Sequence, residues 1–206
     1  KIGRVALFAM IGVGLAMFWL LPVFGALVES KASAGSTFEW SSKIVNDLIT
    51  FPQKFILGSF SEKEWGDPKA LPHLFIGSLG LFGLFVFYVK KEISLRSKLS
   101  ATFILLILLV SFNVQGFDQI WHMGQRPVGF YFRNSWIANA FMLVLASESL
   151  MKWKNSFHFN EFLVALIGFG SILLFSMFAT LSYVEASQKI LAFIIYSIIL
   201  CAFFLT

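Results

Sequence analysis

Apolar residues occur in long, continuous runs that are typical of membrane proteins. The runs cover residues 5–27, 71–89, 99–115, 134–151, 161–183 and 187–206. A helix needs about 20 apolar residues to cross a bilayer, and strands of a membrane barrel would instead alternate apolar and polar residues. The pattern therefore predicts an all-α integral membrane bundle of about six transmembrane helices, forming a single transmembrane domain over residues 1–206.

The composition supports a membrane protein and excludes a soluble domain. Hydrophobic residues make up 58% of the chain and charged residues only 13%. In soluble domains, about a quarter of all residues are charged. The formal net charge of +5 comes mainly from lysines and arginines beside the apolar runs. No basic face outside the membrane is predicted, so we expect membrane lipid and no nucleic acid as a partner.

Cysteine and histidine give no indication of a metal centre. The single cysteine, Cys201, can form no internal disulfide and cannot build a metal site alone. The histidines, His73, His122 and His158, are far apart and lack metal-ligand spacing. We therefore expect no metal site and no cofactor in the chain, with a requirement for a divalent metal ion as the open alternative.

The first two apolar runs are separated by a long amphipathic segment, residues 28–70. Four of its apolar residues recur at helical spacing beside polar ones: Ile44, Val45, Leu48 and Ile49. They predict a short helix that ends near Pro52 and either lies in the headgroup region or packs on the bundle. Turn and charge signals over residues 58–69 predict a surface loop.

Lysine and arginine placement predicts the orientation of the bundle. These residues divide evenly between the two sides, but they are densest in the amino end and in the short links 90–98 and 152–154. Dense positive charge beside short links is typical of the cytoplasmic side. We therefore expect segment 28–70 and the loop 119–133 to lie together on the extracytoplasmic side.

Glycines in the second apolar run indicate close helix packing. Gly77, Gly80 and Gly83 are three residues apart, so a neighbouring helix can approach their backbone. The third run passes into a polar stretch from Asn113 to Asp118, which predicts a broken last turn.

The densest polar cluster lies in the loop between the third and fourth runs. Arg126 and Arg133 flank aromatic residues, and His122 and Asp118 precede them. Two arginines beside a histidine can bind an anionic phosphate through charge-assisted hydrogen bonds, and Trp121 suits either a sugar face or a headgroup. From the residues alone, an aromatic belt with snorkelling arginines is the favoured explanation of the cluster.

This loop resembles the hallmark of the YfhO-type bacterial membrane proteins. Residues 121–133 read WHMGQRPVGFYFR, and the family pattern is roughly Trp-His-Gly-x-Gln-x-Pro-x-x-Phe-x-x-Arg. Residues 20–31 and 71–77 are also similar to family segments, so the resemblance covers most of residues 20–150. Met123 stands where the family usually has Gly, and Phe75 where it often has Tyr.

The resemblance implies a function. YfhO-type proteins are similar to GT-C glycosyltransferases, multi-span enzymes that use polyprenyl-phosphate-linked sugars, and the family is linked to sugar decoration of teichoic acid, a cell-envelope polymer, on the outer face of Gram-positive cell membranes. It implies that Asp118 orients the acceptor or acts as base and that His122 hydrogen-bonds the donor phosphate or the acceptor. The implied substrate-binding residues are Lys31, Trp121, Gln125, Arg126 and Arg133.

The resemblance also leaves alternatives. The sequence begins at Lys1 without an initiator Met, so we expect a middle fragment that lacks the usual upstream catalytic carboxylate and is inactive alone. A lipid-linked oligosaccharide transporter or flippase is the second hypothesis, although the predicted spans carry few ionisable residues. A non-catalytic membrane scaffold, with the loop as headgroup anchor, is the third.

Overall fold

The structure, a computed structural model, describes residues 2–29, 40–46, 48–60, 62, 64, 67, 70–122, 124, 131–155, 158–178 and 186–205. The only pairing of strand type among these residues is an isolated bridge. The all-α membrane bundle predicted from the sequence is confirmed. In order, the helices are α1 (Ile2–Glu29), the 3-10 helix η1 (Leu48–Phe55), α2 (Ser78–Val89), α3 (Leu95–Asn113), α4 (Gln115–Trp121), α5 (Ser135–Asn155), α6 (Phe159–Phe178) and α7 (Ala186–Leu205).

Several of these helices have the length and composition of membrane spans. Within the described residues, three stretches are long and apolar enough to cross a bilayer: Gly3–Ala26, Leu95–Asn113 and Phe159–Ser176. Two shorter apolar stretches are Ser78–Val89 and Ala186–Ile198. The count of six spans stays a prediction.

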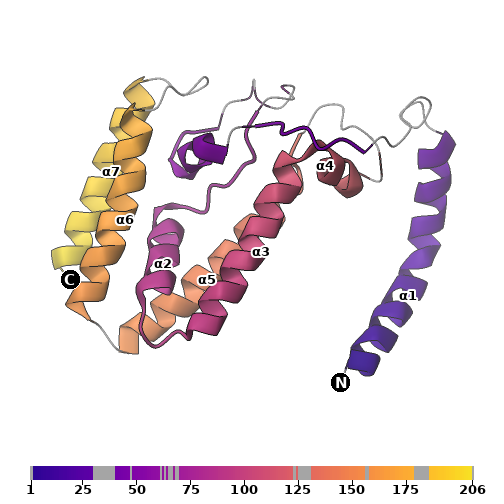
Figure 1. The fold of residues 1–206 in the computed structure, drawn as a ribbon, viewed down its shortest axis with the longest axis horizontal. Coiled ribbons are helices and arrows are strands. Elements are labelled where there is room, and N and C mark those ends of the chain that lie inside the picture. Colours follow the sequence, from indigo (N-terminus) through magenta and orange to yellow (C-terminus); the bar gives the residue numbers. More distant parts are fainter. Residues whose placement is uncertain are drawn as a thin grey trace.

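The ends of the helices lie at two opposite ends of the structure (Figure 1). The start of α1, the α2–α3 link and the α5–α6 link lie at one end, whereas α4, η1 and the start of α5 lie toward the other. Helix α1 stands apart from the remaining helices, and none of its spanning stretch is buried within the chain. The end that carries α4 and η1 is hereafter the α4 end.

The segment that follows the first span is extended at Ile44 and Val45, where the sequence predicts a helix, so the prediction is wrong for these two residues. Ile44 forms the isolated antiparallel bridge with Val114, and the Val45 amide donates to the Asn113 carbonyl at 2.8 Å. The physical reason is that these backbone groups form hydrogen bonds with the end of α3, so they do not need the hydrogen bonds that a helix would provide.

The predicted short helix is displaced and buried. It forms as η1, which encloses Pro52 instead of ending before it. Phe51 and Lys54 are buried, and Tyr196 of α7 accepts a hydrogen bond from the Leu57 amide at 3.0 Å. Of the two predicted positions for this helix, packing on the bundle is therefore the one observed.

Helix α2 begins later than the apolar run that contains it. The run starts at residue 71, but the helix starts at Ser78, after an extended stretch. Pro72 is buried and cannot donate a backbone hydrogen bond, and Gly77 has φ +76°, a conformation that breaks a helix. Twelve residues form a helix of about 18 Å, shorter than the roughly 30 Å of a bilayer core.

Helix α2 packs very closely on α5. A Cβ atom on Gly83 would lie 3.0 Å from the Ala146 side chain and 3.1 Å from its carbonyl oxygen, and one on Gly80 would lie 3.1 Å from Leu143. Ser149 is fully buried and donates to the Gly83 carbonyl at 2.6 Å. The prediction of close packing is confirmed for these two glycines, and it is wrong for Gly77, around which a Cβ atom would meet nothing.

A buried ion pair connects α2 and α6 at the end opposite to α4. The Lys90 ammonium, fully buried, lies 3.2 Å from a Glu161 carboxylate oxygen, whose other oxygen accepts from the Lys91 amide at 2.9 Å. Removing one member of such a pair leaves an uncompensated buried charge. The pair therefore fixes the carboxyl end of α2 against the beginning of α6.

The α2–α5 contact predicts the effect of a larger side chain. Gly83→Val should lower stability by about 1–3 kcal/mol, because the added methyl groups must displace the backbone of α5. Gly170→Val is the matched control, since a Cβ atom there meets nothing within 4 Å. Thermal unfolding of both variants in detergent measures the difference. Equal stability of the two variants would contradict the packing argument.

Candidate functional site

A backbone junction positions the polar cluster at the α4 end. Val114 is extended, with φ −97° and ψ 119°, and it separates α3 from α4, in the stretch where the sequence predicts a break. Gln115 donates to the Lys43 carbonyl at 3.0 Å, and Gly116 donates to the Ser41 carbonyl at 2.8 Å. The first amides of α4 are thereby satisfied by the segment 40–46.

A glycine permits this junction to close. A Cβ atom on Gly116 would lie 2.8 Å from the Trp40 ring, so only glycine fits there. Trp40 also packs edge-to-face on Phe117, with ring centroids 5.1 Å apart. Asn113 is buried and its side-chain oxygen accepts from the Asn46 amide at 2.8 Å. These contacts hold α4 at a fixed angle to α3.

Asp118 and His122 lie on one face of α4, one turn apart. The His122 Nδ1 atom lies 2.8 Å from the Asp118 backbone carbonyl and 3.5 Å from its carboxylate. Because a carbonyl can only accept, Nδ1 carries the proton, and in the neutral ring Nε2 is then an acceptor. Both side chains are mostly buried, with 6% of His122 and 13% of Asp118 exposed.

Arg133 lies at the other end of the loop, within electrostatic range of Asp118. Phe132 has φ +58°, an uncommon backbone conformation for a bulky residue, and its side chain is buried while Arg133 is exposed. Burial raises the pKa of Asp118 above its usual value, whereas the charge of His122, when its ring is protonated, and the charge of Arg133 oppose this rise. Arg133 thus lies close enough to act on the carboxylate.

Several buried polar atoms of the pair, and of residues next to Asp118 and Arg133 in the sequence, have no hydrogen-bond partner among the described residues. They are Asp118 Oδ1, His122 Nε2, Gln119 Oε1 and both side-chain polar atoms of Asn134. A buried polar atom without a hydrogen-bond partner lowers the stability of the fold by about 1–3 kcal/mol. Several such atoms in one region therefore indicate a site where a polar ligand can supply the missing hydrogen bonds. The group can therefore accept hydrogen bonds from hydroxyl groups and hold negative charge at Arg133.

Of the residues that the sequence indicates, the structure places Asp118 and His122 in contact, and Arg133 lies within electrostatic range of Asp118. Trp121 lies beside them at the end of α4 with 42% of its surface exposed. Lys31, Gln125 and Arg126 lie outside the described residues. The roles assigned to these residues stay predictions.

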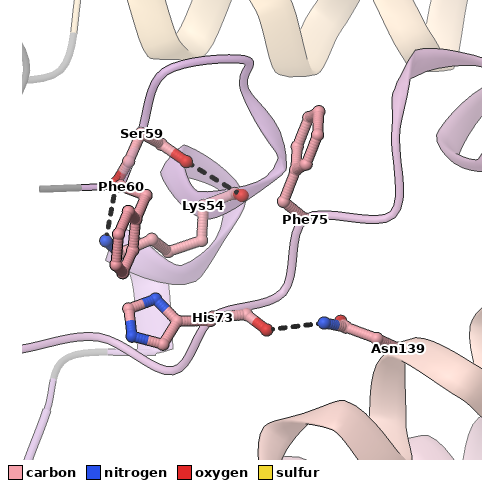
Figure 2. Close-up of a pocket in the computed structure, with 6 residues that line it drawn as sticks. All are labelled: Lys54, Ser59, Phe60, His73, Phe75 and Asn139. Carbon is pink, nitrogen blue, oxygen red and sulfur yellow. Dashed lines mark hydrogen bonds between the residues drawn. The ribbon is translucent and has the colours of Figure 1, made fainter.

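Sequence analysis missed a second polar group, which lines a cavity of about 240 Å³. The lining residues come from η1, the chain that follows it, the stretch before α2, and α5 (Figure 2): Lys54, Ser59, Phe60, His73, Phe75 and Asn139.

One residue that lines this cavity, Lys54, belongs to a buried ion pair. The Lys54 ammonium contacts the Glu64 carboxylate and donates to the Ser59 carbonyl at 2.7 Å. Burial lowers the pKa of Lys54, and the hydrogen bond and charge of Glu64 oppose that effect. The surface loop predicted over residues 58–69 is therefore wrong at Glu64, which is 2% exposed. The one sign of a buried charge in the sequence was Lys54, which stands among apolar residues in the stretch FPQKFILG.

Comparison with known proteins identifies a family. Residues 1–206 match the model of a family described as bacterial membrane protein YfhO. Neither the curated proteins nor the solved structures include a significant match to this chain. The family description gives the membrane as the location and states no reaction.

Proposed function

Because this chain belongs to the YfhO family of bacterial membrane proteins, we propose that it acts in a membrane glycosyltransferase. The enzyme transfers a sugar from a polyprenyl-phosphate donor to a cell-envelope polymer such as teichoic acid. The location that fits this reaction is the cell membrane of a Gram-positive bacterium, with the α4 end on the extracytoplasmic side.

The group formed by Asp118, His122 and Arg133 is the single observation that carries this proposal. It joins a carboxylate of raised pKa, an imidazole nitrogen free to accept a hydrogen bond, and an exposed guanidinium. The basic residues of the short links lie at the other end of the bundle, which supports an extracytoplasmic position for the group. A donor phosphate at the headgroup level can reach such a position.

Each of these three residues has a separate role in the transfer step. The acceptor hydroxyl oxygen forms a bond to the anomeric carbon while the bond from that carbon to the phosphate oxygen breaks. The hydroxyl proton moves to the Asp118 carboxylate, and the bonding electron pair leaves with polyprenyl phosphate. Arg133 stabilises the charge that grows on the phosphate, and His122 Nε2 accepts a hydrogen bond from a second acceptor hydroxyl.

Removal of the guanidinium tests the phosphate role. Arg133→Ala should reduce sugar transfer in membranes by about 100- to 1,000-fold, the usual effect of losing one charge-stabilising group. The measurement uses the full-length protein at matched expression. Arg96→Ala is the control, because Arg96 is an exposed arginine at the opposite end, at the start of α3.

Two outcomes would contradict the proposal. Unchanged transfer by an inserted, folded Arg133→Ala protein would remove the phosphate role. Movement of the intact lipid-linked sugar across reconstituted vesicles, with no glycosidic bond cleaved, would favour the flippase hypothesis instead.

The raised pKa of Asp118 predicts the pH dependence of transfer. The base form is needed, so kcat/KM should rise with pH along an acidic limb that lies above the pKa of an exposed aspartate. Arg133 lowers the pKa of Asp118, so Arg133→Gln should move this limb to higher pH, whereas Arg133→Lys, which keeps the charge, should not. Identical limbs in the wild type and Arg133→Gln would contradict the action of Arg133 on the Asp118 carboxylate.

A further inference from the structure

The cavity bordered by η1 and α5 has its own chemistry, separate from the Asp118 group. Of its six lining residues, Lys54 alone carries a formal charge at neutral pH, and the contacting Glu64 carboxylate compensates it. Burial and the Lys54 charge both lower the pKa of His73, so its imidazole is neutral there. A phosphate would need positive charge that is not already matched. The cavity therefore favours an uncharged ligand.

The lining offers both kinds of hydrogen-bonding group. The Asn139 amide nitrogen donates to the His73 carbonyl at 2.8 Å, and its side-chain oxygen is buried without a hydrogen-bond partner among the described residues (Figure 2). A neutral imidazole supplies one donor and one acceptor. A ligand with several hydroxyl groups, each both donor and acceptor, satisfies such a set.

Two phenylalanines give the cavity apolar surfaces at its opening. Phe60 is 50% exposed and Phe75 is 40% exposed. Phe60 packs on the His73 ring with centroids 4.8 Å apart, which holds both rings in place. A pyranose ring combines apolar faces with hydroxyl groups around its edge, so it fits between aromatic surfaces and polar ones.

The size of the cavity and its place agree with a single sugar ring. Its volume of about 240 Å³ lies just below the range of roughly 300–1,000 Å³ typical for drug-sized ligands. Asn139 lies one turn into α5, about 6 Å along the helix axis from Ser135, which follows the loop of Arg133. The cavity and the Arg133 site thus lie at the same end of one helix.

We propose that this cavity, lined by Phe60, His73, Phe75 and Asn139, binds the ring of a neutral monosaccharide. Its identification as the sugar that is transferred rests on the proposed function. The binding of a free sugar does not, because it follows from the lining chemistry alone.

Binding of free sugars tests this inference directly. The full-length protein in nanodiscs is titrated with the methyl glycosides of glucose, galactose and N-acetylglucosamine, and saturation-transfer NMR detects contact. We expect saturable binding of at least one glycoside, weakened about tenfold by Asn139→Ala through loss of a hydrogen bond, and similarly by Phe60→Ala. Asn160→Ala is the matched control, because Asn160 is exposed on α6.

The outcomes separate this inference from the proposed function. Absence of saturable binding for all three glycosides would overturn the inference. So would binding that both Asn139→Ala and Phe60→Ala leave unchanged while each protein stays folded, or inorganic phosphate that competes with the sugar at this cavity. Arg133→Ala should keep full sugar binding, so loss of transfer in that variant with binding intact supports both conclusions.

Discussion

The close packing of α2 on α5 is the contact on which the rest of the structure depends. Gly80 and Gly83 allow the two backbones to meet, and Ser149 adds a buried hydrogen bond to the Gly83 carbonyl. Lipid is as apolar as the helix surfaces, so helices in a membrane associate through such close packing and polar contacts. Because α2 is short, the chain before it enters the bundle and brings His73 to Asn139.

Irregular backbone inside a membrane protein must find partners within the protein. The structure meets this requirement twice at the α4 end. Segment 40–46 hydrogen-bonds across the break between α3 and α4, and Tyr196 of α7 bonds to the chain that follows η1. The Asp118–His122 pair lies beside the first of these irregular segments, and the cavity lies beside the second.

Hydropathy and glycine spacing predicted the helical membrane bundle and a close helix contact at Gly80 and Gly83, since both depend on local composition, but they did not identify α5 as the partner. The loop motif predicted the family correctly, and the α3–α4 break followed from a polar stretch. The extended backbone at Ile44 could not be predicted, because it depends on pairing with Val114, which is distant in the sequence. The burial of Glu64 could not be predicted either, because a charged residue in a polar stretch normally indicates an exposed loop, whereas Glu64 pairs with the buried Lys54. The cavity was missed because its residues come from four separate stretches of the chain.

We propose that a lipid phosphate binds beside Asp118, His122 and Arg133. Photo-crosslinking with a polyprenyl-phosphate analogue that carries a diazirine next to the phosphate tests it in membranes. We expect labelling of peptides from α4 and from residues 131–134, and loss of that labelling in Arg133→Ala. Labelling confined to the lipid-facing surfaces of α1 and α3, unchanged by Arg133→Ala, would contradict it.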